Sequence, residues 1–181
     1  MWIDMDTLIY DMSFEIPFER YDKVNMVIWG DKFRIRKLVD GHYGVNSGVF
    51  LLRNNDWSRE FIDVLTTFGH DNGKAREPEM KRVMYKYDHF ITDQNAFVYV
   101  LRTYPKFINY VYFENYYGLN RYWSEYTFLL KLNPFLIHFA GCQFCPGPIR
   151  PKCEQTWNVY VNKSNLSFSK TLSNLNIHHY K

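Results

Sequence analysis

Several features of common protein classes are scarce or absent in this 181-residue sequence. It has no run of about 18 uncharged apolar residues, which a transmembrane helix requires. Its N-terminus has no basic segment followed by an apolar one, which would mark a secretory signal peptide. No anchor or signal is therefore encoded in this chain. The net charge is only +3, from 22 Lys and Arg against 19 Asp and Glu. This excess is too small and too evenly spread for a nucleic-acid-binding surface, so nucleic acid is not an expected partner.

Apolar and aromatic residues are abundant. Apolar residues make up 46% of the chain and aromatic residues 19%, including 15 Tyr, 15 Phe and 5 Trp. This composition is ample for a hydrophobic core and excludes wholesale disorder. The length fits one ordinary domain. Aromatic side chains also line sites that stack on flat or sugar-like ligands, although most of them are expected in the core.

Alternating strand and helix patterns predict an α/β fold. Apolar runs predict strands over residues 24–29, 45–52, 108–113 and 134–140. Helical spacing of large apolar residues predicts a helix over 56–68 with Asp56 as its N-cap, and a second helix over 93–103 capped by Thr92 or Asp93. The polar stretch 70–88 is predicted to be a surface loop or a loosely packed helix.

Two carboxylates and one histidine are candidate metal ligands. Asp4 and Asp6 are two residues apart at the end of an apolar segment, where both can reach one hard cation. The alternative is a solvated acidic turn. His138 interrupts an apolar strand, as either a core histidine bonded to a backbone carbonyl or a ligand for a borderline cation such as Mn²⁺.

Three cysteines lie within twelve positions, at Cys142, Cys145 and Cys153. One interpretation is a disulfide, most simply between Cys145 and Cys153, although spacing alone does not settle the pairing. The other is a structural zinc site in which His138 completes a Cys₃His set. We rank the disulfide first. Two glycosylation sequons near the C-terminus favour the secretory pathway.

Two polar positions border predicted elements. Asp93 starts a helix, where it acts either as a cap or, in a cleft, as a partner for an acceptor hydroxyl or an oxocarbenium-like centre. Asn46 stands among small residues and either contacts a sugar or belongs to an ordinary turn.

Taken in order, these motifs resemble one family. It is the galactosyl/xylosyltransferase family of plants and fungi, glycosyltransferase family 34, which includes xyloglucan 6-xylosyltransferases and galactomannan galactosyltransferases. The similarity runs from Trp2 to about Trp157, and weakly through the tail. It rests on residues 2–9, 11–20, 44–54, 92–96 and 138–145.

The resemblance implies a GT-A fold, a Rossmann-like mixed sheet flanked by helices, that binds a UDP-sugar with Mn²⁺. It identifies the metal ligands as Asp4, Asp6 and His138. It also places Asp93 and Gln94 in the catalytic cleft, where the family has Asp-Asp-Gln and this chain has Thr92 as the first residue.

The resemblance assigns further residues to the two substrates. The donor-binding residues are Asn46, Ser47, Gly48, Gly141 and Gln143. Val45 and Ser47 depart from the family's Leu-Asn-Ala-Gly segment, and Gln143 stands where the xylosyltransferases often have Lys. The acceptor side is expected to include Glu114, Tyr122 and Trp123.

The expected activity is transfer of xylose or galactose from a UDP-sugar to a polysaccharide or glycan, with retention of configuration. Homologous transferases are possible partners in a complex. Two alternatives stand beside this hypothesis. One is a catalytically impaired relative that binds glycan or a partner enzyme. The other is a small domain stabilised by zinc or a disulfide, without sugar chemistry.

The same resemblance predicts how the chain is organised. Residues 1–160 are expected to form the C-terminal portion of a GT-A catalytic domain that lacks its first nucleotide-binding strands, and residues 161–181 a polar tail. The complete protein would then carry an upstream membrane anchor and face the Golgi lumen.

Overall fold

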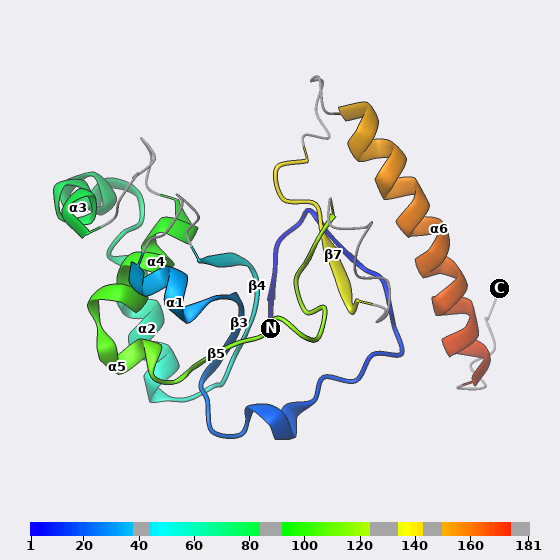
Figure 1. Ribbon diagram of the computed structural model, residues 1–181, viewed down its shortest axis with the longest axis horizontal. Helices are drawn as coiled ribbons and strands as arrows, with labels where there is room; N and C mark the ends of the chain where they lie inside the picture. Colours follow the sequence, from blue (N-terminus) through cyan, green and yellow to red (C-terminus); the bar gives the residue numbers. More distant parts are fainter. Residues whose placement is uncertain (38–43, 84–91, 124–133, 143–149, 175–181) are drawn as a thin grey trace. The chain divides into compact units, whose positions relative to one another are not determined.

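The computed structural model describes residues 1–37, 44–83, 92–123, 134–142 and 150–174 (Figure 1). The chain forms two compact units. Unit 1 comprises Met1–Trp2 and Phe18–Asn115, and unit 2 comprises Ile3–Pro17 and Tyr116–Lys181.

Unit 1 contains a mixed four-stranded sheet. The strand order is β1-β4-β3-β5, with β1 at Trp2–Ile3, β3 at Met26–Gly30, β4 at Val45–Leu52 and β5 at Val111–Phe113. Strand β3 runs antiparallel to β4 and parallel to β5. The strand predicted over 45–52 is confirmed, whereas the one predicted over 108–113 is shorter because Pro105–Ile108 forms helix α5.

The helices of unit 1 lie to one side of strands β3 and β4 in Figure 1. They are α1 (Lys32–Lys37), α2 (Asp56–Thr66), α3 (His70–Val83), α4 (Asp93–Thr103) and α5. A separate 3₁₀ turn, η1, spans Phe18–Tyr21. Helix α4 packs against β4 and α2 and is buried from Asn95 to Leu101. Aromatic rings join these layers, since Phe61 contacts both Phe97 and Phe107.

Two helix starts test the predicted caps. Thr92 caps α4, as predicted, because its Oγ1 accepts a hydrogen bond from Asn95 N at 3.2 Å. The predicted Asp56 cap of α2 is wrong. Asn55 has the extended conformation of an N-cap and its side chain accepts from Ser58 N, so Asp56 is already helical. The polar segment from residue 70 is helix α3 as far as Val83.

Unit 2 contains a three-stranded sheet with a long helix beside it (Figure 1). The strand order is β2-β7-β6, with β2 at Thr7–Ile9, β6 at Arg121–Tyr122 and β7 at Leu136–His138. Strand β7 is antiparallel to β2 and parallel to β6. Helix α6 spans Arg150–Asn174, so it continues beyond residue 160. The boundary predicted at that position stays a prediction.

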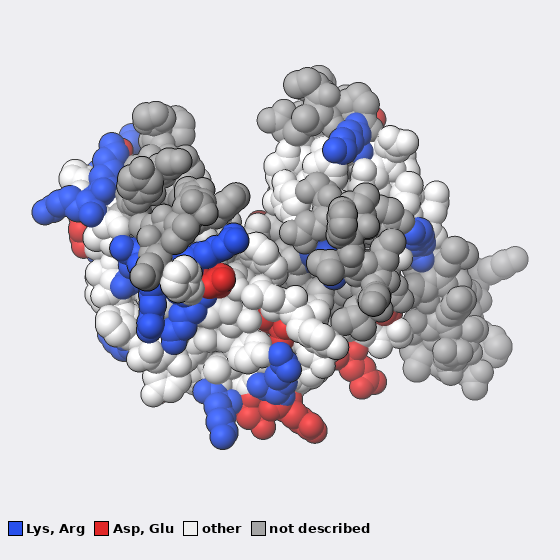
Figure 2. Space-filling model, viewed as in Figure 1, with Lys and Arg blue, Asp and Glu red and all other residues white. Residues whose placement is uncertain are grey.

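The α/β class is thus confirmed, with mixed sheets flanked by helices. Within the described parts of the chain, no helix is long and apolar enough to cross a membrane. Charged side chains of both signs are interspersed with uncharged surface on the visible face in Figure 2. This distribution agrees with the small net charge of +3.

Candidate functional site

The structure brings Asp4, Asp6 and His138 together in unit 2. Both aspartates belong to the turn between β1 and β2, which is held by a hydrogen bond from Thr7 Oγ1 to Asp4 O at 2.7 Å. The backbone N–H of Phe139 donates to Asp6 O at 2.8 Å. Because Thr7 pairs with His138 in the antiparallel ladder, the turn lies beside the histidine. We call these three residues the Asp-His cluster.

The ligand atoms of the Asp-His cluster face one another. His138 Nε2 lies 3.1 Å from Asp6 Oδ1 and 3.9 Å from Asp4 Oδ2, and one ligand atom from each residue lies within 4.8 Å of the others. The side chain of His138 is 4% exposed, whereas the side chain of each aspartate is 36% exposed. The cluster is therefore anchored in the sheet on the histidine side and open on the carboxylate side.

Asn120 fixes the tautomer of His138. Its Oδ1 lies 3.0 Å from His138 Nδ1, and both side chains are buried. An amide oxygen only accepts hydrogen bonds, so this pairing requires a proton on Nδ1, and the other ring nitrogen, Nε2, faces the carboxylates. Sequence reasoning missed Asn120, and no motif signals it, because its role depends on β6 lying beside β7.

These residues fit a divalent cation. Two carboxylate oxygens and an imidazole nitrogen suit Mn²⁺ by ligand chemistry. Ligands about 2.2 Å from one ion lie about 3 to 4.4 Å apart, and the distances of 3.1 Å and 3.9 Å from His138 Nε2 to the two carboxylates fall in this range. Three electron-rich atoms directed at one point repel one another unless a cation or a proton lies among them.

A second group of predicted site residues meets in unit 1. Ser47 on β4 is buried, and its Oγ donates a 2.6 Å hydrogen bond to Asp93 Oδ2 at the start of α4. Asp93 is exposed and Gln94, the next residue of α4, is half-buried. Asn46 Oδ1 accepts from Gly48 N at 2.9 Å. The predicted catalytic and donor-binding residues of unit 1 are therefore neighbours.

The residues predicted on the acceptor side fall in two places. Glu114 in unit 1 is 1% exposed, and its carboxylate accepts from Tyr21 Oη at 2.8 Å and Arg20 Nε at 3.2 Å. Burial, and then the hydrogen bond to Glu114, raises the pKa of Tyr21 well above its usual value, so its hydroxyl stays a donor. Glu114 thus packs inside unit 1 and does not present its carboxylate on a surface.

Tyr122 and Trp123 belong to unit 2, at the end of β6. Tyr122 pairs in register with His138, and Trp123 Nε1 donates to Ala140 O at 3.2 Å. Gly141, the residue after Ala140, has a φ of 72°, which lies in the left-handed region that favours glycine. These residues surround the end of β7, close in sequence and register to the Asp-His cluster. Gln143 lies outside the described residues.

The predicted disulfide between Cys145 and Cys153 is wrong. Cys153 is bonded instead to Cys142, with Cα atoms 5.7 Å apart, and Cys145 lies outside the described residues. The turn after β7 brings Cys142 against the start of α6, where Cys153 is fully buried. The zinc alternative fails for the same reason, since two of its thiolates form the disulfide and His138 Nε2 faces carboxylates.

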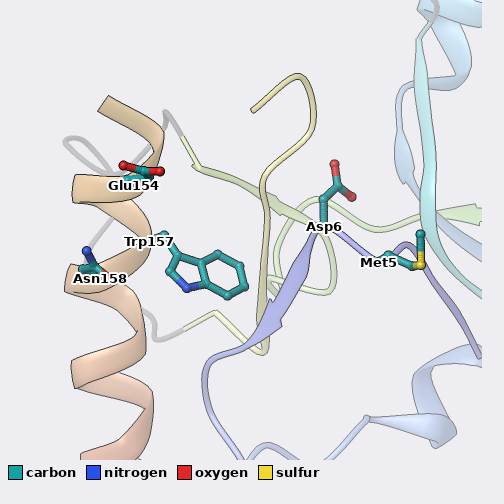
Figure 3. A pocket seen from close by; sticks show the side chains of 5 residues that line it. All are labelled: Met5, Asp6, Glu154, Trp157 and Asn158. Carbon is teal, nitrogen blue, oxygen red and sulfur yellow. The ribbon is translucent and has the colours of Figure 1, made fainter. Parts of the chain in front are cut away.

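A pocket of about 570 Å³ opens beside the Asp-His cluster. Its described lining residues are Met5, Asp6, Glu154, Trp157 and Asn158 (Figure 3). The first two belong to the turn between β1 and β2, and the other three project from α6. All of them belong to unit 2. Sequence reasoning named Asp6 alone among them as a site residue.

Comparisons with known proteins agree with the motifs. A model of the galactosyl transferase GMA12/MNN10 family matches residues 1–147. Xyloglucan 6-xylosyltransferase 2 of Arabidopsis thaliana is 33% identical over 80% of this chain and 35% of its own length. Galactomannan galactosyltransferase 1 of Cyamopsis tetragonoloba is 27% identical over 98% of this chain and 51% of its own length. The chain thus spans about a third to a half of the length of these relatives.

Proposed function

The chain belongs to the galactosyl transferase GMA12/MNN10 family, and we propose that it is part of a metal-dependent glycosyltransferase. The transferase moves xylose or galactose from a UDP-sugar to a polysaccharide, with retention of configuration, on a GT-A fold in the Golgi lumen. The observation that carries the proposal is the Asp-His cluster, three ligand atoms within 4.8 Å of one another in a member of this family. The transferred sugars and the polysaccharide acceptor are taken from the names of the similar proteins, and the UDP carrier is what the family resemblance implies.

Each side chain has a part in this proposal. Asp4, Asp6 and His138 would hold Mn²⁺, which would offset the charge of the UDP diphosphate and of the departing UDP. The Nδ1–H contact with Asn120 keeps the imidazole in the tautomer that a metal requires. Asp93 and Gln94 line the reacting face, where the Ser47 hydroxyl orients the Asp93 carboxylate through its 2.6 Å hydrogen bond.

Calorimetry of this chain with UDP and Mn²⁺ tests the metal assignment. We expect UDP to bind only when Mn²⁺ is present. Asp4→Asn and Asp6→Asn keep the side-chain volume but remove a charged ligand, so each should weaken Mn²⁺ binding by about 100-fold. Asp11→Asn is the matched control, because Asp11 is an aspartate of unit 2 that bonds Ser13 instead of the cluster.

Two outcomes contradict the proposal. UDP binding that persists in a chelator would show that the cluster does not hold a catalytic metal. An equal loss of Mn²⁺ affinity in Asp11→Asn would show that removal of any carboxylate of unit 2 has this effect. Metal-dependent UDP binding without sugar transfer by the complete protein would instead favour the catalytically impaired relative.

A further inference from the structure

One wall of the pocket beside the Asp-His cluster is formed by residues that the sequence did not predict as site residues. Glu154, Trp157 and Asn158 line it from α6, whereas the family model matches residues 1–147. These positions are spaced i, i+3 and i+4, so they share one face of the helix. The opposite wall is the turn that carries Asp6, one of the proposed metal ligands (Figure 3).

We propose that this pocket binds a pyranose ring of a substrate, with the Trp157 indole as its stacking surface and Glu154 and Asn158 as partners for sugar hydroxyls. This inference rests on the proposed function, because it takes the ring from the donor or acceptor of that reaction. It adds residues of α6 to a site otherwise built from the turn between β1 and β2 and from β7.

The position of Trp157 is fixed by the strand that carries His138. Its ring meets Phe139 edge-to-face, with centroids 4.9 Å apart, and Phe139 directly follows His138. The indole is only half-buried, whereas Cys153 and Tyr160 of the same helix are buried in the core. Trp157 therefore lies at the border of the core, with the pocket on one side (Figure 3).

The chemistry of the lining favours a neutral sugar. The volume of about 570 Å³ falls within the usual range for small-molecule pockets. A flat indole suits the apolar face of a pyranose, a carboxylate accepts hydrogen bonds from hydroxyls, and an amide both donates and accepts. The described lining residues include no cationic side chain and two carboxylates, which accept hydrogen bonds from sugar hydroxyls.

The disulfide keeps this wall in place. Cys153 precedes Glu154 directly and is bonded to Cys142, four residues after His138. One covalent link therefore joins the helix that lines the pocket to the segment that carries the metal-ligand histidine. This arrangement gives α6 a defined position relative to Asp6 within unit 2.

Titrations of this chain in saturating Mn²⁺ test the proposal, with UDP, UDP-xylose, UDP-galactose and neutral glucan or mannan oligosaccharides as probes. We expect Trp157→Leu to weaken binding of a sugar-bearing probe roughly three- to tenfold, since it removes the stacking ring. Glu154→Gln should weaken binding of the same probe, because it replaces a carboxylate, which only accepts hydrogen bonds, with an amide that both donates and accepts them. Val159→Ala, an exposed neighbour on α6, is the control and should change nothing.

The probes separate the sources of the ring. Weaker binding of the UDP-sugars with unchanged oligosaccharide binding assigns the pocket to the donor sugar, and the reverse assigns it to the acceptor. Unchanged binding of every sugar probe in both variants overturns the proposal. Glu154→Gln keeps the test valid if Trp157→Leu does not fold, as judged by circular dichroism. Binding of UDP alone should be the same in all variants, and its absence in the unsubstituted chain would instead contradict the proposed function.

Discussion

At the scale of single residues, the central feature is a histidine whose two ring nitrogens have different partners. Nδ1 is bonded to Asn120 inside the sheet, and Nε2 faces Asp6 at 3.1 Å. The buried amide both orients the ring and sets its tautomer, which are the usual contributions of a partner behind a metal-binding histidine. Asn120 is thus part of the site although it is not one of the proposed metal ligands.

Replacing Asn120 by Ala should lower Mn²⁺ affinity by about 10- to 100-fold, because the imidazole loses the acceptor that holds its proton on Nδ1. Calorimetric titration with Mn²⁺ measures the change. Asn109→Ala is a suitable control, since Asn109 is an exposed residue after α5 in unit 1. Unchanged Mn²⁺ affinity in a folded Asn120→Ala variant would contradict this role.

At the scale of elements, α6 is fastened to the sheet of unit 2 in two ways. Its apolar contacts join Tyr160 and Trp157 to Phe139 on the segment after β7. The disulfide adds a covalent link between Cys142 and Cys153, with a sequence separation of 11. A crosslink over such a short loop restricts the unfolded chain moderately and contributes about 3 kcal/mol in the chain-entropy model.

Reduction of the disulfide should therefore lower the free energy of unfolding of unit 2 by up to about 3 kcal/mol, measured by urea titration with and without a reductant. Cys142→Ser should reproduce the loss and make the protein insensitive to reductant, whereas Cys145→Ser should leave the crosslink intact. Chymotrypsin can cleave after Phe144 and so separate Cys142 from Cys145. A peptide that links Cys145 to Cys153 would contradict the observed pairing.

At the scale of the whole molecule, the candidate residues are divided between the two units. The Asp-His cluster and the pocket belong to unit 2, and the pair of Ser47 and Asp93 belongs to unit 1. Metal binding should consequently stabilise one unit directly. A ligand at 100 times its dissociation constant contributes about 2.7 kcal/mol to the state that binds it.

Mn²⁺ with UDP should thus slow amide hydrogen exchange in β2 and β7, by up to about 100-fold where exchange requires unfolding of unit 2. Helix α2 of unit 1, which carries none of the proposed metal ligands, serves as the internal reference. Exchange followed by mass spectrometry reports both regions in one experiment. Equal protection of α2 and β7, or protection that persists in Asp6→Asn, would contradict a metal site confined to unit 2.

The sequence by itself determined the local features. Its apolar periodicity predicted β4, α2 and α4 because strands and helices bury every second residue or one helical face. The cap at Thr92 followed from a hydroxyl placed just before an apolar helical run. The motifs around Asp4, Asp6 and His138 identified the family, since each is weak alone and their order along the chain is specific.

Only the tertiary structure decided the features that join distant segments. Asn120 became the partner of His138 through the pairing of β6 with β7. Cys153 is bonded to Cys142, whose Cα lies 5.7 Å from its own. Disulfide formation depends on distance in space and not on spacing in sequence, so the sequence alone did not determine this pairing. Glu114 lies in the interior of unit 1, where Tyr21 and Arg20, more than 90 residues earlier in the sequence, donate hydrogen bonds to its carboxylate. The pocket beside Asp6 exists because α6 folds back along β2, a contact that no local pattern encodes.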